Sequence, residues 1–300
     1  MWLVVAILAY FLLAVVSLFD RYFLVGPISS PKVYTFYIGI SCLLFCLFLI
    51  PFGISFPAAG MIFLGLIAGL TRMLGTLFLT ISITKSEISR AVPAIGALQP
   101  IFSFFLFFLF LPQSRALTIF QIVAFILLVF GSALISIKKF DREFFSSKVL
   151  KYPIIASFLY SLTFFLIKNL FLGTTFLNGM FLILFGNGLA SLVFFSFPKN
   201  REVIFNQKLS KKISGFFILG QTLGGLALLF QYRAVFLAKP EQVPLINALE
   251  GTRYVFLLFF VFLLSNWKPQ LLKEEVSKEV FLPKVLALLL IVGGMALLVF

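Results

Sequence analysis

The nonapeptide VPAIGALQP at residues 92–100 decides the interpretation of this chain, because a close copy of it, VPLINALEG, recurs at residues 243–251. In both copies a segment of small and polar residues opens a long apolar run. Small residues let two backbones approach closely, and the polar side chains enter an apolar environment at the same place. The recurrence predicts two related halves, with a functional site at these segments.

The composition is that of an integral membrane protein. Of the 300 residues, 62% are hydrophobic and 11% are charged, and the mean hydropathy is +1.15. A water-soluble domain of this size cannot bury so much apolar surface. A membrane-spanning helix needs about 20 mostly apolar residues, and ten such runs with short links account for nearly the whole chain. We therefore expect an all-α polytopic membrane protein with ten transmembrane helices and no soluble domain.

Breaks in hydropathy set the expected helix boundaries. The runs are continuously apolar, whereas the strands of a membrane barrel alternate apolar and polar residues. The first run has no basic segment before it and no small-residue cleavage site after it, which favours a retained helix over a signal peptide. The ten predicted helices cover residues 2–19, 33–50, 59–83, 87–111, 117–137, 149–167, 175–197, 213–237, 240–264 and 285–300.

The internal repeat extends well beyond the nonapeptides. At a constant offset of 147, Arg21 falls on Lys168, Gly39 on Gly186, and Pro51 on Pro198. Later in the chain, GSAL at residues 131–134 matches GMAL at residues 294–297. We expect a first five-helix repeat at 1–139, a basic link at 140–150 and a second repeat at 151–300.

An odd number of helices in each repeat forces the two halves to cross the membrane in opposite senses. Such inverted repeats recur in secondary transporters, where the substrate site lies near the middle of the membrane between the halves. The repeat therefore predicts a transporter working by alternating access.

These residues resemble the drug/metabolite transporter superfamily, in its ten-helix form made of two EamA-like five-helix domains. The turn Leu98-Gln99-Pro100 resembles the family's leucine-x-proline turn, and Leu249-Glu250-Gly251 matches it with Gly in place of Pro. The glycines at Gly131 and Gly294 also resemble the family pattern. The likeness covers the whole chain, and it implies export or exchange of metabolites by alternating access without naming a substrate.

Three charged residues inside predicted helices are the first candidates for a substrate site. Arg72 lies near the centre of its helix, where a charge costs about 2.5 to 3.5 kcal/mol on insertion scales, so we expect it to face a cavity. There it would attract a carboxylate or phosphate; the alternative is a purely structural ion pair. Glu250 and Arg253 are three residues apart on one helical face and can pair with each other. Glu250 is either the carboxylate that couples transport to a proton or half of an ion pair that locks the helix.

Polar side chains on neighbouring predicted helices extend this set. The alternative reading for each is an ordinary helix-to-helix hydrogen bond. The additional candidates for substrate binding are Gln99, Gln221, Gln231, Tyr232 and Asn247. The residues expected to shape helix turns and close packing are Pro93, Pro100, Pro244, Gly251, Gly131 and Gly294.

The sequence lacks the residues that metal-binding and nucleotide-binding sites require. The chain has no His and only two Cys, four residues apart on one helix face, which does not make a metal site. No phosphate-binding P-loop is present, and we expect no cofactor. The charge of +14 comes from Lys and Arg in the links that flank the spans, which favours contact with lipid head groups over nucleic acid.

Two arguments disagree on orientation. Eighteen of the 24 Lys and Arg residues lie in the links after the odd-numbered helices or, like Arg90 and Lys151, at the start of the helix that follows. The positive-inside rule then places both termini outside the cell, whereas the family resemblance implies that both lie in the cytoplasm.

The sequence as a whole predicts a multi-pass secondary transporter in the cell membrane that exports or exchanges a small polar metabolite, with a proton as a candidate coupling ion. The expected partners are this substrate and the lipid bilayer, and the oligomeric state is not indicated. The sequence does not predict an enzyme. The two alternatives are a polytopic enzyme acting on lipid-linked substrates and a non-transporting sensor or assembly subunit.

Overall fold

The structure is a computed structural model that describes residues 1–85, 88–110, 117–136, 147–207, 210–267 and 278–299. Regular structure in these residues is helical. The first half contains α1 (Trp2–Val25), α2 (Pro31–Leu49), the 3-10 turn η1 (Ile50–Phe52), α3 (Ala59–Lys85), α4 (Ile88–Phe110) and α5 (Ile119–Ser136). The second half contains α6 (Ser147–Gly173), α7 (Phe176–Ser196), α8 (Pro198–Phe205), α9 (Lys211–Leu237), η2 (Pro240–Gln242), α10 (Val243–Ala248), α11 (Glu250–Trp267) and α12 (Lys278–Leu297). The prediction of an all-α protein is confirmed for the described part of the chain.

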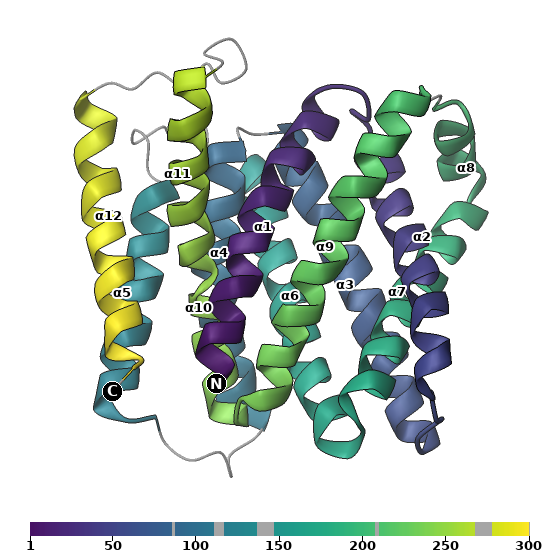
Figure 1. Ribbon diagram of the computed structural model, residues 1–300, viewed down its shortest axis with the longest axis horizontal. Helices are drawn as coiled ribbons and strands as arrows, with labels where there is room; N and C mark the ends of the chain where they lie inside the picture. Colours follow the sequence, from purple (N-terminus) through teal and green to yellow (C-terminus); the bar gives the residue numbers. More distant parts are fainter. Residues whose placement is uncertain (86–87, 111–116, 137–146, 208–209, 268–277, 300) are drawn as a thin grey trace.

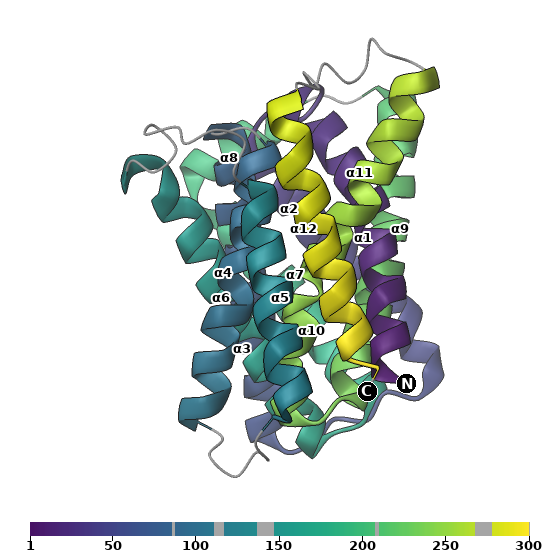
Figure 2. The ribbon, with the colours of Figure 1, turned by 90° about the vertical axis from the view of Figure 1, so that its left-hand side faces the viewer.

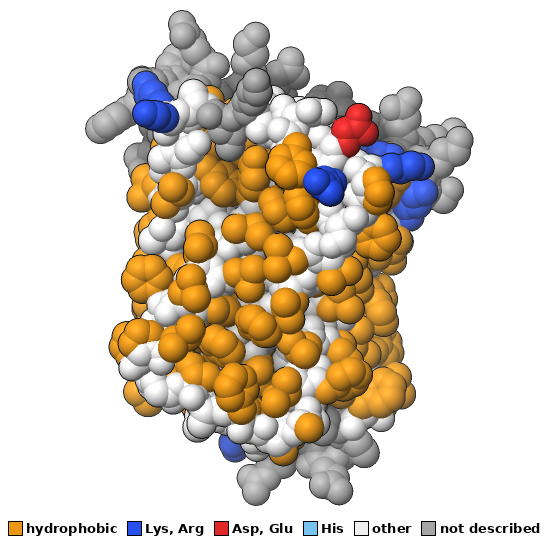
Figure 3. All heavy atoms as spheres, turned by 90° about the vertical axis from the view of Figure 1, so that its right-hand side faces the viewer, with side chains coloured by type: hydrophobic (Ala, Val, Ile, Leu, Met, Phe, Trp, Pro, Cys, Tyr) orange, Lys and Arg blue, Asp and Glu red, His pale blue; other side chains and the backbone are white. Residues whose placement is uncertain are grey.

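Many of these helices are long and apolar enough to cross a membrane. Within the described residues, length and composition qualify six of them, namely α1, α2, α3, α6, α7 and α9. Shorter apolar helices include Ala94–Phe110 and Ile119–Leu134. Apolar side chains cover the middle of the face drawn in Figure 3, and charged side chains lie toward its two ends. The chain is therefore a multi-pass membrane protein.

The long helices run side by side along one direction, and both termini lie at the same end of the bundle (Figure 1). The turn between α1 and α2 lies at the opposite end. Lys32 lies in the first turn of α2, Lys85 ends α3, and Lys211 begins α9, so these basic residues lie at that same opposite end. We refer to it as the basic end.

Two helices continue past their predicted ends. α1 runs on from residue 19 to Val25, and α6 continues through Lys168 to Gly173. Lys168 is only 4% exposed, and its Nζ donates to the carbonyl oxygens of Val235 at 3.2 Å and Ala238 at 2.5 Å. An ammonium group stabilises the unpaired carbonyls at a helix C-terminus. A residue that hydropathy places in a link therefore caps α9.

The predicted single helix at 240–264 is interrupted. A turn at Leu249 separates the short α10 from α11, at the end of the second nonapeptide. A break inside the membrane exposes backbone carbonyls that water cannot reach. The hydroxyl of Tyr10, a fully buried residue on α1, donates to the carbonyl oxygen of Ile246 at 2.7 Å. This contact satisfies one carbonyl in the turn preceding the break.

The two longer links predicted in the middle of the chain differ in what the structure describes of them. The link at 199–212 contains a short helix, α8, and Gln207 donates from Nε2 to the carbonyl of Pro27 at 2.9 Å, which ties this link to the α1–α2 turn. Most of the predicted link at 140–150 lies outside the described residues.

Glycine allows the closest helix contacts in the bundle. A Cβ atom added at Gly69 of α3 would collide with the backbone of Gly186 and Asn187 on α7, and one added at Gly186 would lie 2.7 Å from Leu66 Cα. α5 and α12 also lie side by side (Figure 2). A Cβ at Gly131 would lie 2.7 Å from Ile291 Cγ1, and one at Gly294 would lie 2.9 Å from Leu128 Cγ. The packing role predicted for Gly131 and Gly294 matches these contacts.

The α3–α7 contact predicts a large difference between two glycine substitutions. Gly69→Ala forces a methyl group against the α7 backbone, and overpacking of this kind costs about 1 to 3 kcal/mol. Gly215→Ala on α9 is the matched control, because nothing lies within 4 Å of its Cβ position. We expect Gly69→Ala to lower the thermal unfolding midpoint of the detergent-purified protein and Gly215→Ala to leave it unchanged or higher. Equal midpoints for the two variants would contradict this packing.

Candidate functional site

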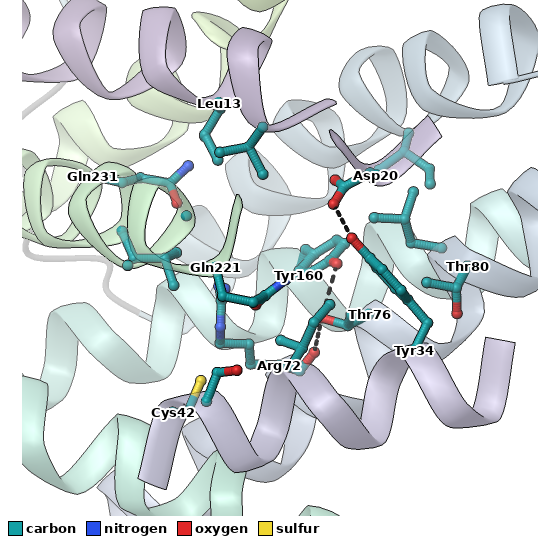
Figure 4. Close-up of a pocket in the computed structure, with 18 of the residues that line it drawn as sticks. Leu13, Asp20, Tyr34, Cys42, Arg72, Thr76, Thr80, Tyr160, Gln221 and Gln231 are labelled. Atoms are coloured by element: carbon teal, nitrogen blue, oxygen red, sulfur yellow. Dashed lines mark hydrogen bonds between the residues drawn. The ribbon is translucent and has the colours of Figure 1, made fainter. Parts of the chain in front are cut away.

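A cavity of about 160 Å³ lies among α1, α2, α3, α4, α6, α7, α9 and α11. Its apolar wall includes Leu13, Ile38, Phe45, Leu79 and Phe164, and polar and charged side chains interrupt this wall on several helices (Figure 4). Since about 10 to 15 Å³ of such space holds one water molecule, the cavity has room for roughly ten. It is large enough for a small metabolite.

The cavity reaches further toward the basic end than toward the termini. Leu24 near the end of α1, Tyr34 near the start of α2 and Ile83 near the end of α3 all line it. The lining residue of α1 closest to the N-terminus is Leu13, in the middle of that helix. The cavity thus begins near the middle of the bundle and extends toward the basic end.

Glu250 and Arg253 form the predicted ion pair at the cavity wall. Arg253 Nη1 lies 2.8 Å from Glu250 Oε1, and the two side chains are 11% and 10% exposed, in that order. Arg253 Nε also donates to Ser17 Oγ on α1 at 2.8 Å, and Ser17 in turn donates to the carbonyl of Leu13 at 2.7 Å. The pair joins the first turn of α11 to the middle of α1, so part of its role is structural.

Arg72 lines the cavity from the middle of α3 and has no ion-pair partner among the described carboxylates. Its Nε atom is buried without a hydrogen-bond partner. Its guanidinium lies 5.7 Å from the centroid of the Tyr232 ring, a cation–π contact, and the Tyr232 hydroxyl is likewise buried without a partner. Buried polar groups normally find partners. Arg72 is therefore a cation with unused capacity to bind an anionic group.

Asp20 is a cavity carboxylate that the sequence did not identify. Hydropathy places it just after the first helix, but α1 continues to Val25, and Asp20 lines the cavity. The Tyr34 hydroxyl on α2 donates a hydrogen bond to Asp20 Oδ1 (Figure 4). No described Lys or Arg forms an ion pair with Asp20. A neutral hydroxyl is therefore its direct partner.

The two nonapeptides meet in the bundle. Gln99 Nε2 donates to Asn247 Oδ1 at 3.3 Å, and Asn247 Nδ2 donates to Ser103 Oγ at 2.9 Å. Ser161 on α6 donates to the Gln99 carbonyl at 2.7 Å. Gln99 lines the cavity, whereas Asn247 is fully buried behind it. The repeated segments thus form a hydrogen-bonded junction, with one of the two amides at the cavity wall.

Some of the remaining predicted residues line the cavity, and the others lie behind its wall or within helices. Gln221 and Gln231 line the cavity from α9, and Tyr232 lies behind Arg72. Pro244 occupies the first turn of α10, where proline is tolerated. Pro100 is buried within α4, so no turn occurs there.

Two predicted packing positions remain. Pro93 falls within α4, but its side chain lies outside the described part. Gly251 is the second residue of α11, where an added Cβ would collide with Ser132 Oγ on α5.

Several further lining residues escaped the sequence analysis. Thr76 and Thr80 follow Arg72 at intervals of four, so all three share one face of α3, and this spacing is the signal that could have identified them. The Tyr160 hydroxyl on α6 donates to Thr76 Oγ1 at 3.2 Å (Figure 4). Cys42 on α2 also lines the cavity, a position that its spacing of four residues from Cys46 does not indicate. Cys46 instead contacts the Phe181 carbonyl at 3.6 Å.

A metal centre finds no support in the described residues, which contain no group of three or more His, Cys, Asp or Glu placed to hold an ion. Both cysteines are free and buried. The side chains at the cavity can bind a small polar molecule through charge and hydrogen bonds.

Comparisons with known proteins bear on the fold of this chain and not on its function. No protein-family model and no curated protein matches this sequence. The crystal structure of another protein is similar to this one, with a TM-score of 0.70 and 14% sequence identity. The match covers 99% of this chain and 97% of the other chain. A likeness at this identity shows a shared fold along the whole chain. The resemblance to drug/metabolite transporters therefore stays a prediction.

The buried Glu250–Arg253 pair predicts non-additive effects on stability. Arg253→Met leaves the Glu250 carboxylate without its partner, and loss of one member of a buried pair costs about 3 to 5 kcal/mol. We expect the double variant Glu250→Gln/Arg253→Met to recover most of this loss, measured as the free energy of unfolding in detergent.

Arg233→Met is the matched control for that cycle. Arg233 stacks on the rings of Phe176 and Phe236, each 5.2 Å away, and a partly exposed contact of this type contributes about 0.5 to 1 kcal/mol. Additive losses in the Glu250/Arg253 cycle would contradict a direct, buried interaction.

Proposed function

We propose that this protein is a secondary transporter of a small polar metabolite and that it works by alternating access in a cell membrane. The observation that carries the proposal is a cavity inside a membrane bundle that extends toward the basic end, with Arg72 at its wall lacking any described acidic partner. Charged groups at membrane depth are costly and typically mark substrate or ion pathways. A purely structural Arg would be paired, as Arg253 is.

Helix packing supports the inverted repeat on which this mechanism depends. Exchanging the two halves relates α1 to α6 and α3 to α9. In the bundle α3 packs mainly against α6, and α1 packs mainly against α9, so each contact has its counterpart. α2 packs against α7, and α5 packs against α12, as expected for equivalent helices that meet at a shared axis. The proposed ten-helix arrangement is consistent with this pattern.

The equivalent contacts α3–α7 and α2–α9 are unequal, which supports a transporter held in one of its two states. α3 packs on α7 through glycine, with no room for a side chain. The equivalent helices α9 and α2 meet instead through aromatic rings, with Phe217 5.9 Å from Tyr34 and 5.8 Å from Tyr37 between centroids. Alternating access requires one side to be tightly closed while the other can separate. We assign the α3–α7 contact to the closed side.

The proposed direction of access follows from the same geometry. The cavity extends toward the basic end, and an excess of Lys and Arg usually marks the cytoplasmic side. We therefore assign the cavity to cytoplasmic access and place both termini outside.

Uptake into proteoliposomes tests the transport proposal. Against a panel of amino acids, organic acids, nucleotides, sugars and cationic drugs, we expect saturable uptake of at least one compound, which should also raise the unfolding temperature of the protein. Arg72→Ala should lower that uptake at least tenfold, and Arg233→Ala, outside the cavity, should not. Normal saturable uptake by both Arg72→Ala and Glu250→Gln would remove these residues from the mechanism, and absence of uptake across the panel would contradict transport.

Cys42 offers a native reporter of access. The chain has two cysteines, so Cys46→Ser leaves Cys42 alone in the cavity wall. We expect a membrane-impermeant anionic methanethiosulfonate to label it faster from the side of the basic end than from the side of the termini, in vesicles of opposite orientation. Cys42→Ser is the control, since Cys46 lies outside the cavity. Equal labelling rates from both sides would contradict a single open side.

A further inference from the structure

We propose that the transported molecule is a monocarboxylate with an apolar body, whose carboxylate binds the guanidinium of Arg72. This inference rests on the proposed transport function, and it names the substrate class of the same cavity. The unsatisfied guanidinium of Arg72 decides the sign of the ligand, and the remaining wall decides its body.

Two of the four formally charged side chains that line the cavity, Arg72 and Asp20, have no ion-pair partner among the described residues. Arg253 is neutralised by Glu250 at 2.8 Å. Asp20 accepts a hydrogen bond from the Tyr34 hydroxyl. Arg72 keeps an unpaired positive charge and a buried Nε with no acceptor. A planar guanidinium matches a carboxylate through two parallel hydrogen bonds.

The two acids in the cavity favour a single negative charge on the ligand. A carboxylate brings one charge, which Arg72 balances. A phosphate monoester at neutral pH brings close to two, and the second would face Asp20 and Glu250 without a free cation among the described lining residues. Desolvated charges without partners are costly. The cavity therefore selects a carboxylate over a phosphate.

The wall around Arg72 sets the body of the ligand. Leu13, Val16, Ile38, Leu79 and Phe164 present apolar surface, and pockets of this kind bind an apolar body while a few polar groups fix its orientation. The volume of about 160 Å³ suits a molecule of roughly ten non-hydrogen atoms, taking one per water-sized site. A short aliphatic or phenyl chain with a terminal carboxylate fits these limits.

A matched set of ligands tests the proposal in purified full-length protein. Three probes share a phenyl body and differ in charge: 3-phenylpropanoate carries one negative charge, phenyl phosphate carries up to two, and 2-phenylethylamine carries one positive charge. A fourth probe, hexanoate, replaces the ring of the first by an aliphatic chain. Binding is measured by calorimetry and by the rise in unfolding temperature. We expect both carboxylates to bind at least tenfold more tightly than the amine and the phosphate.

Variants assign the binding to Arg72. Arg72→Gln should weaken carboxylate binding at least tenfold, Arg72→Lys should retain part of it, and the control Arg233→Gln should leave it unchanged. Because Arg72 has no acidic partner to leave behind, Arg72→Gln should unfold at the same temperature as the wild type or higher without ligand, which separates lost binding from lost folding. If Arg72→Gln proves unstable, the comparison of Arg72→Lys with wild type carries the test.

The outcomes separate this inference from the transport proposal. Failure of both carboxylates to bind wild-type protein, tighter binding of the amine or the phosphate, or full carboxylate affinity in Arg72→Gln would each overturn the monocarboxylate assignment. Saturable uptake of the amine alone would leave transport standing and overturn this inference. Carboxylate binding at Arg72 without uptake of either carboxylate into proteoliposomes would support the ligand class and count against transport.

Discussion

Polar groups inside a bilayer must find their partners within the protein, and this constraint organises the middle of the bundle. Arg253 binds both Glu250 and Ser17, Tyr10 satisfies a carbonyl at the break after α10, and Lys168 caps the end of α9. The contacts of Arg253 with Ser17, Tyr10 with Ile246 and Lys168 with Ala238 join segments distant in the sequence. Since lipid is as apolar as leucine, the hydrophobic effect contributes little to helix association there, and close packing with internal hydrogen bonds must supply it. The same groups that would be expensive in lipid therefore fix how the helices meet.

Two exceptions to this rule lie next to each other at the proposed site. Arg72 at the cavity wall and Tyr232 behind it both retain buried polar atoms without partners. A binding site must hold such groups in place before the ligand arrives, at a cost in stability that the rest of the fold offsets. Arg253 shows the contrast, because its ion pair and hydrogen bond use its binding capacity within the protein. Similar residue types on two helices thus have different roles, decided by their neighbours.

The glycine contact and the aromatic contact give the bundle two unlike interfaces. α3 and α7 meet backbone to backbone at Gly69 and Gly186, whereas α2 and α9 meet through the ring of Phe217. A contact without intervening side chains leaves little freedom to slide, and a contact made by rings can be rearranged by changes in side-chain rotamers. In the proposed mechanism the two interfaces exchange these roles as the cavity changes sides.

The sequence by itself determined the class of the protein, its helical nature and the positions of most helices. About 20 consecutive apolar residues in a bilayer must satisfy their backbone hydrogen bonds within the segment, and an α-helix does this. It also placed Arg72, Gln99, Gln221, Gln231, Glu250 and Arg253, all of which line the cavity, since polar residues in apolar runs are conspicuous. Only the tertiary structure decided that Asp20 and Lys168 lie inside the bundle, because hydropathy treats a charge near a helix end as a boundary. The break at Leu249 also escaped the pattern, and the Tyr10 hydroxyl that donates to the preceding Ile246 carbonyl lies more than 200 residues away. Partners that distant depend on how helices pack, and a local pattern carries no record of that packing.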